Sequence, residues 1–209
     1  MRKNSYPGKF IVFDGLDGSG QSTQVELLKN FLIKKGHQVV LTKEPTQDSE
    51  AGKKIRQVLD KKKIISPEEL QKLFTEDRKE HLENIILPAL KENKIAISDR
   101  YFFSTFAYGV SEGLDLNWLI KLNDECLLPD LTFFLKVSPE ICVSRIEKRG
   151  ISKTYFEEKE KLNKVWQTYE ILTSLFKNIN IINGEKPKEE VFFQIKEVVF
   201  SKLLNKKEV

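Results

Sequence analysis

Three glycines stand close together near the start of the chain, in the stretch Phe10–Thr23, which reads FIVFDGLDGSGQST. An apolar run rich in β-forming residues precedes them, and a helical pattern follows them. Because glycine tolerates positive φ and carries no side chain, backbone N–H groups in such a loop can converge on an anion at the positive end of the helix. The stretch predicts a phosphate-binding loop, and the alternative is an ordinary tight turn between a strand and a helix. The glycines are Gly15, Gly18 and Gly20.

The loop follows the phosphate-binding pattern GxxxxGK[ST] at Gly15, Gly20 and Ser22, with one exception. Gln21 occupies the lysine position. A lysine would place a positive charge beside the β and γ phosphates of a nucleotide, whereas an amide offers only neutral donors. We expect the backbone of the loop to bind phosphate without that lysine.

Charged residues follow two further predicted strands, at the sheet edge where open α/β proteins place their ligands. The sequence KEP at 43–45 follows the strand predicted over 37–41, and Asp99 and Arg100 follow the strand predicted over 94–98. A carboxylate and an arginine at this edge can hold a metal-bound water and a phosphate, respectively. The alternative for 43–45 is a solvated charged loop.

A predicted helix that begins at Pro67 carries Phe74 and Arg78 on one face, since they are four residues apart. An aromatic ring can stack on a nucleobase, and a guanidinium beside it can donate to a carbonyl edge. The alternative is a core phenylalanine and a surface arginine with no ligand. Asp77 interrupts the apolar stripe of the same helix.

Five β segments alternate with helices, which predicts an α/β fold: a parallel sheet with right-handed crossovers and helices on both faces. One helix is expected over 116–128 and another over 156–178. Residues 149–155, RGISKTY, have little apolar content and predict a mobile lid with basic side chains, with a surface turn as the alternative. The strands are expected at 10–13, 37–41, 94–98, 131–137 and 180–182.

The composition indicates one soluble domain over residues 1–209. Charged residues make up 32% of the chain, and no apolar run approaches the roughly 20 residues that a membrane span requires. The basic N-terminus leads directly into the first strand and does not resemble a signal peptide, so we expect a cytoplasmic protein. The formal net charge is +4, but lysines alternate with glutamates, which predicts neither a nucleic acid nor a membrane as partner.

Cysteine and histidine are scarce. Cys126 and Cys142 lack CxxC spacing and predict buried thiols without a disulfide. His37 and His81 are too few and too far apart for a zinc site. Any metal should therefore arrive with a nucleotide.

The ordered motifs resemble those of the thymidylate kinases, which belong to the nucleoside monophosphate kinase group of P-loop proteins. The resemblance runs from Phe10 to about Val199, and it implies a three-layer α/β/α fold of the P-loop NTPase type. It also implies transfer of the γ-phosphoryl group of ATP, bound with Mg²⁺, to dTMP, in a homodimer formed through helices such as those starting at Pro67 and Leu116. The motifs are GLDGSGQSTQ at 15–24, KEP at 43–45, GKKIR at 52–56, LFTEDR at 73–78, SDRYFFSTFAY at 98–108 and PDLTFFLKVSPE at 129–140.

By resemblance, the nucleoside is recognised by residues from three motifs. Asp17 is expected to bind the 3′-hydroxyl, Phe74 to stack on thymine, and Arg78 to donate to its O4. Ser104 matches a base contact, and Tyr108 matches a ring that packs under the sugar and disfavours a 2′-hydroxyl. The full set expected to contact the monophosphate is Asp17, Glu44, Pro45, Phe74, Arg78, Arg100, Ser104 and Tyr108.

The phosphates are expected to meet a second set of residues. Arg100 resembles the arginine that spans the donor and acceptor phosphates, while Ser22 and Asp99 are the expected magnesium-side residues. The catalytic set is Lys43, Asp99, Arg100, Arg149 and Lys153, the last two from the lid. The residues expected to bind ATP are Gly15, Asp17, Gly18, Ser19, Gly20, Gln21, Ser22, Thr23 and Arg145.

Four departures from the family pattern keep alternatives open. Gln21 replaces the loop lysine, Lys43 stands where arginine is usual, Thr46 and Gln47 replace a glycine pair, and Gly109 replaces a common glutamine that would be a polar contact near the base. Gly18 resembles the arrangement in which the lid supplies the missing charge. The alternatives are a nucleotide-binding module with weak catalysis and a kinase for another monophosphate, such as dUMP.

Overall fold

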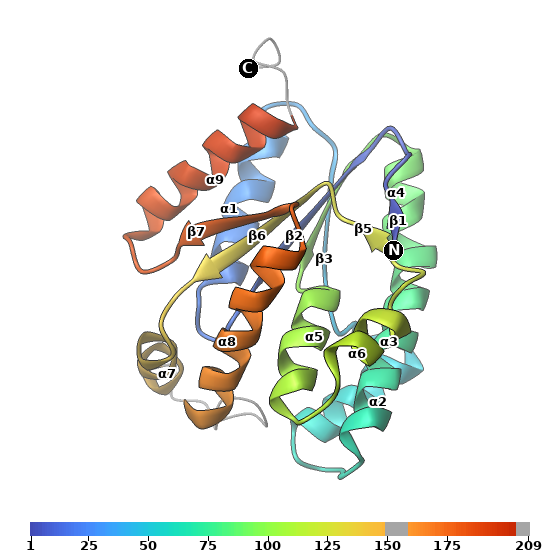
Figure 1. Ribbon diagram of the computed structural model, residues 1–209. Helices are drawn as coiled ribbons and strands as arrows, with labels where there is room; N and C mark the ends of the chain where they lie inside the picture. Colours follow the sequence, from blue (N-terminus) through green and yellow to red (C-terminus); the bar gives the residue numbers. More distant parts are fainter. Residues whose placement is uncertain (149–158, 204–209) are drawn as a thin grey trace.

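The computed structural model of the chain describes residues 1–148 and 159–203. A parallel sheet of five strands lies at its centre and confirms the predicted α/β fold (Figure 1). Each predicted strand is present, with bounds that differ by one or two residues at most ends. In spatial order the strands are β3 (Val39–Lys43), β4 (Ile95–Asp99), β2 (Lys9–Gly15), β6 (Leu131–Lys136) and β7 (Ile179–Asn183).

Helices cover both faces of this sheet. On one face, α1 (Gln21–Lys34) packs beside α9 (Lys188–Lys202). The other helices contribute buried side chains to the core on the opposite face. They are α2 (Glu50–Leu59), α3 (Pro67–His81), α4 (Leu87–Lys91), α5 (Phe102–Ser111), α6 (Leu116–Leu122), α7 (Pro139–Lys148) and α8 (Lys159–Leu175).

The central strand β2 is apolar because it is covered on both sides. Side chains alternate between the faces of a strand, so Phe10 and Val12 enter one core while Ile11 and Phe13 enter the other. All four are completely buried. This is why the strand appears in the sequence as a continuous apolar run and not as an alternating pattern.

The start of α3 is fixed by local hydrogen bonds that the sequence specifies. The Ser66 side chain accepts from the backbone N–H of Glu69, and the Glu69 carboxylate accepts from the backbone N–H of Ser66. The helix then continues through a π-helical turn, Leu82–Ile86, into α4. Pro88 lies two residues after this turn, and it has no N–H to donate to an α-helical partner. Asn93, with φ of 58°, follows the end of α4.

The helix predicted over 116–128 is shorter than expected. It ends at Leu122, where the Asn123 side chain donates to the carbonyl of Leu119. Leu127–Leu128 form instead a short strand, β5, which pairs in parallel with β1 (Arg2–Lys3). Two-residue strands carry no sequence pattern, so this second sheet was missed.

The helix predicted over 156–178 is also shorter at its C-terminal end, since α8 ends at Leu175. Residues 156–158 and the predicted lid at 149–155 lie outside the described residues.

In the described part of the chain, no helix is long and apolar enough to cross a membrane. Cys126 and Cys142 are both buried thiols, as predicted.

The sheet brings the ends of three strands to one edge. Lys43 at the end of β3 lies opposite Asp99 at the end of β4, and Asp99 in turn lies opposite Phe13 of β2. Strands β4 and β6 flank β2. Strands β3 and β4 lie on one side of β2 and the later strands β6 and β7 on the other, so the strand order reverses direction beside β2. Ligands of open α/β sheets bind at this position.

Candidate active site

The phosphate loop joins the end of β2 to the start of α1. Gly15, Gly18 and Gly20 all have positive φ, at 154°, 86° and 93°. A Cβ atom at Gly18 would lie 2.6 Å from the carbonyl oxygen of Cys142, so no side chain fits at this position. Gly20 is the N-cap of α1 and makes no side-chain cap hydrogen bond. The first N–H groups of the helix are therefore available to an anion.

Ser22 and Asp99 meet beside the loop. The Ser22 hydroxyl donates to Oδ2 of Asp99 at 2.6 Å, and Nζ of Lys43 lies 3.1 Å from the same oxygen. The other carboxylate oxygen, Oδ1, is buried and has no hydrogen-bond partner among the described residues. Oxygen ligands of this kind suit Mg²⁺. In the described ranges no group of three or more His, Cys, Asp or Glu side chains could hold a metal ion, so a metal here needs further ligands.

Gln21, the departure from the loop pattern, is a buried residue. Only 6% of it is exposed, and its Oε1 has no hydrogen-bond partner in the described part of the chain. A Cβ at Gly15 would lie 3.6 Å from this oxygen, so the amide is packed against the loop itself. The position therefore places a neutral polar group where the pattern has a cation.

Arg145 of α7 holds the phosphate loop from outside. Its Nη1 donates to the carbonyl oxygen of Ser19 at 3.2 Å and more weakly to that of Gly18 at 3.5 Å, and its Nη2 donates to the carbonyl of Gly184 after β7. The predicted ATP-side arginine thus lies at the loop. Arg149 and Lys153 lie outside the described residues.

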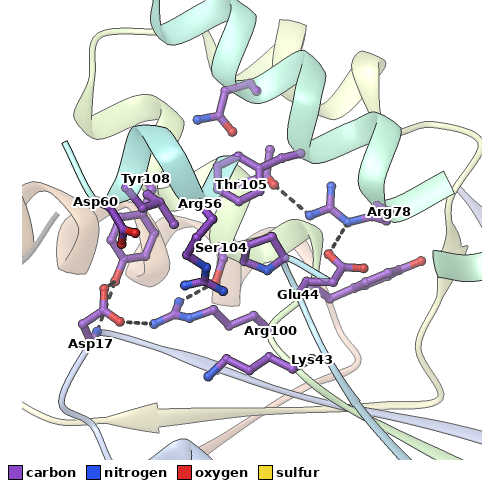
Figure 2. Close-up of a pocket in the computed structure, with 15 residues that line it drawn as sticks. Asp17, Lys43, Glu44, Arg56, Asp60, Arg78, Arg100, Ser104, Thr105 and Tyr108 are labelled. Atoms are coloured by element: carbon purple, nitrogen blue, oxygen red, sulfur yellow. Dashed lines mark hydrogen bonds and ion pairs between the residues drawn. The ribbon is translucent and has the colours of Figure 1, made fainter. Parts of the chain in front are cut away.

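Arg100 connects the loop to the adjoining pocket (Figure 2). It has φ of 77°, and its guanidinium donates to Asp17 at 2.7 Å, to Ser104 at 2.7 Å and to the carbonyl of Gly15 at 3.2 Å. The Tyr108 hydroxyl donates to the other oxygen of Asp17 at 2.8 Å. Burial lowers the pKa of Arg100, but the Asp17 carboxylate raises it, and the net pKa is well above the usual value. The guanidinium is therefore a permanent positive charge.

Asp14 is a site residue that sequence reasoning missed. It is buried, and its carboxylate accepts hydrogen bonds from the hydroxyls of Ser104 and Tyr169 and from the backbone N–H groups of Gly15, Tyr101 and Ser104. Burial raises the pKa of this carboxyl, while Arg100 and the hydroxyl donors act in the opposite direction. The sequence feature that could have identified Asp14 is an acidic residue at the end of an apolar strand, directly before the first glycine of the loop.

Arg78 is buried, so the alternative of a surface arginine is wrong. It is 1% exposed, and its Nε donates to Glu44 at 2.8 Å. Its two other nitrogens donate to Asn123 at 2.7 Å and Thr105 at 2.9 Å. His81 lies 3.1 Å from the second oxygen of Glu44. The segment 43–45 therefore contributes Glu44 to a buried ion pair with Arg78 and is not merely a solvated loop.

Asp77, the polar interruption in the α3 stripe, organises the loop that follows Pro45. Its carboxylate accepts from the backbone N–H of Thr46 at 2.9 Å and from the hydroxyls of Thr46 and Ser49. Thr46 is one of the departures from the family pattern, and here it is a hydrogen-bond donor to the helix. The loop that follows Pro45, a residue of the pocket lining, is thereby attached to α3.

One pocket gathers all eight residues predicted to contact the monophosphate, together with Lys43 (Figure 2). Arg56 and Gln71 line it as well and were not predicted, although Arg56 closes the GKKIR motif. The predicted residues in the lining are Asp17, Lys43, Glu44, Pro45, Phe74, Arg78, Arg100, Ser104 and Tyr108. The other lining residues that were missed are Leu59, Asp60, Tyr101 and Thr105.

The fold and the site define a P-loop nucleotide-binding protein with a pocket for a second ligand beside the phosphate loop. The family model described as thymidylate kinase matches residues 13–195, and the chain belongs to the thymidylate kinase family. A probable thymidylate kinase of Pyrococcus horikoshii is 41% identical over 94% of this chain and 98% of its own length. A thymidylate kinase of Desulfotalea psychrophila is 37% identical over 92% of this chain and 96% of its own. One from Caldicellulosiruptor saccharolyticus is 36% identical over the same shares.

Replacing Glu44 with alanine should strongly destabilise the protein. The change leaves the Arg78 charge buried without its carboxylate, which costs about 3–5 kcal/mol in comparable pairs. Urea unfolding measures the difference. The matched control is Glu26→Ala, because Glu26 pairs with Lys29 at 3.3 Å on an exposed surface, and its effect should stay within about 0.5 kcal/mol. Equal effects of the two changes would contradict a structural role for the buried pair.

Proposed function

We propose that this protein transfers the γ-phosphoryl group of ATP to dTMP, giving ADP and dTDP. The observation that carries the proposal is the continuity of the pocket with the phosphate loop. Arg100 donates to both Asp17 in the loop and Ser104 in the pocket wall, and the pocket extends from there to Phe74 and Arg78. Membership of the thymidylate kinase family and the similarity to thymidylate kinases of other organisms support the same activity.

The base end of the pocket suits a pyrimidine with a carbonyl at position 4. Phe74 offers a ring for stacking, and Arg78 has five N–H groups. Three of these N–H groups bond to described side chains, which leaves two for a ligand. Because Glu44 fixes the guanidinium, these donors are oriented before the base arrives.

The phosphate end of the pocket supplies positive charge. The acceptor phosphate has a second pKa near 6, so it is already a nucleophilic anion at neutral pH and no general base is required. The protein's tasks are in-line alignment and neutralisation of the phosphoryl group in transit. Lys43, Arg56 and Arg100 line this part of the pocket and are the cations that perform them.

ATP is expected to bind with its phosphates on the loop backbone of residues 18–22. Ser22 and Asp99 would hold Mg²⁺, which supplies further positive charge to the phosphates when it is bound. We also propose that residues 1–209 act as one kinase domain, and that Arg149 and Lys153, outside the described residues, approach ATP from the segment 149–155.

The two alternatives are less favoured. A weakly catalytic binding module was suggested by Gln21 alone, and neither the family match nor the names of the relatives favours it. A preference for another monophosphate, such as dUMP, has no specific observation in its favour.

An ADP-release assay over a panel of monophosphates tests the proposal. dTMP should be turned over, and dCMP should have a kcat/KM at least roughly tenfold lower, because its 4-amino group would leave an Arg78 donor unpaired. dUMP keeps the carbonyl and serves as the matched comparison. Equal kcat/KM values for dTMP and dCMP would show that the assignment of Arg78 is wrong.

A second prediction concerns the missing loop lysine. If Lys43 supplies the charge that Gln21 lacks, Lys43→Met should lower kcat by about 10² to 10³, as removal of one preorganised donor does elsewhere. Gln21→Lys alone should raise kcat or leave it nearly unchanged. In the Gln21→Lys background the Lys43 change should cost less, because the two charges are partly redundant.

The control for this cycle is Lys34→Met, which removes an exposed cation from the last turn of α1 and should leave kcat unaltered. Strictly additive effects of the Lys43 and Gln21 changes would contradict compensation by Lys43. If native protein bound ATP but phosphorylated no monophosphate, and Gln21→Lys restored activity, the binding-module alternative would be correct.

We further propose a homodimer, on the basis of family resemblance, with the surfaces of α3 and α6 as candidate contacts. Light scattering at micromolar concentration should give about twice the 24.3 kDa of one chain. A mass of one chain at that concentration would contradict the proposal.

A further inference from the structure

Gln71 is a pocket residue to which no role has yet been given. It lies on α3 and lines the same pocket as Phe74 and Arg78. These three residues are spaced by three and four positions, so they share one face of the helix. Along that face the order is an amide, an aromatic ring and a guanidinium.

The amide oxygen of Gln71 has no hydrogen-bond partner in the described part of the chain. The residue is 1% exposed, and its Oε1 is buried with no hydrogen-bond partner among the described residues. Its backbone carbonyl, in contrast, accepts from the Thr75 hydroxyl at 3.0 Å. Buried polar atoms are rarely left unpaired, and an unpaired acceptor on a residue that lines a pocket can be satisfied by a donor on the ligand.

Gly109 of α5 lies against this amide. A Cβ atom at position 109 would lie 2.8 Å from a methyl carbon of Leu119 and 3.5 Å from the amide carbon of Gln71. Thymidylate kinases commonly have a glutamine at the position of Gly109. The Gln71 amide therefore lies next to the place where a side chain at position 109 would begin. In this chain the amide at that place comes from α3, whereas the family pattern has a glutamine on α5.

We propose that Gln71 is a specificity-determining residue that accepts a hydrogen bond from the N3–H of the pyrimidine base. This inference rests on the proposed function. Thymine and uracil carry a hydrogen on N3, beside the O4 assigned to Arg78, so the two polar side chains would contact adjacent atoms while Phe74 stacks on the ring. In cytosine N3 is an acceptor, which would face the amide oxygen without a hydrogen between them. With the amide oxygen of Gln71 toward the base, Gln71 and Arg78 thus each disfavour cytosine through a separate contact.

The first test replaces the amide with an apolar side chain of similar length. Gln71→Met should lower kcat/KM for dTMP and dUMP by roughly tenfold, mainly through KM, because one hydrogen bond to the base is lost. The value for dCMP should change by less than about twofold, so discrimination against it shrinks. The matched control is Gln57→Met on the exposed face of α2, which should change none of the three values. An equal loss for all three nucleotides would indicate a merely structural role and overturn the inference, as would no loss at all.

The second test changes the substrate. The monophosphate of N3-methyl-deoxythymidine lacks the N3 hydrogen and carries a methyl group in its place. The unaltered protein should turn it over at least roughly tenfold less efficiently than dTMP. Gln71→Ala, which removes the amide and opens space beside N3, should use this analogue better than the unaltered protein does.

The outcomes separate the two proposals. Equal use of dTMP and its N3-methyl analogue by the unaltered protein would overturn the Gln71 inference alone, and this measurement needs no variant. Absence of turnover of every monophosphate by the unaltered protein would instead overturn the proposed function.

Discussion

A single buried carboxylate, that of Asp14, joins the phosphate loop to the helices around it. It lies at the end of the central strand and accepts hydrogen bonds from the loop, from the start of α5 and from Tyr169 of α8. Burial raises its pKa, and the donors and the nearby Arg100 offset part of that effect. Because a buried carboxylate is stable only while its donors stay in place, the positions of the loop, Arg100 and Ser104 are mutually dependent.

The cations of the pocket are held in two different ways. Arg78 has a buried carboxylate partner, Glu44, and is fixed on three sides. Arg100 pairs with Asp17, whose side chain is 30% exposed at the edge of the pocket. A preorganised cation loses little free energy to reorganisation when an anion arrives. Under the proposed function, the fixed guanidinium of Arg78 would recognise the base, and the guanidinium of Arg100, near the loop, would meet phosphate.

The phosphate loop itself contributes no side-chain cation. Gly18 cannot carry one, because α7 leaves no space for a Cβ atom. Gln21 contributes a neutral amide that is packed against Gly15. Positive charge must therefore reach the phosphates from neighbouring elements, and in the described part of the chain Lys43, Arg100 and Arg145 are the cations that lie against the loop or against Ser22 and Asp99. Backbone N–H groups remain the loop's own contribution to anion binding.

Local patterns determined much of this protein by themselves. The glycine loop, the five strands and the start of α3 at Pro67 depend on residues close together in the chain, so the sequence alone predicted them. Only the tertiary structure decided the use of Arg78, whose partners Glu44, Thr105 and Asn123 lie 27 to 45 residues away. Only the tertiary structure likewise decided the pairing of β1 with β5 and the position of Gln71 beside Gly109. Spacing along the chain specifies which face a side chain occupies, but the partner that meets it there depends on how distant elements pack.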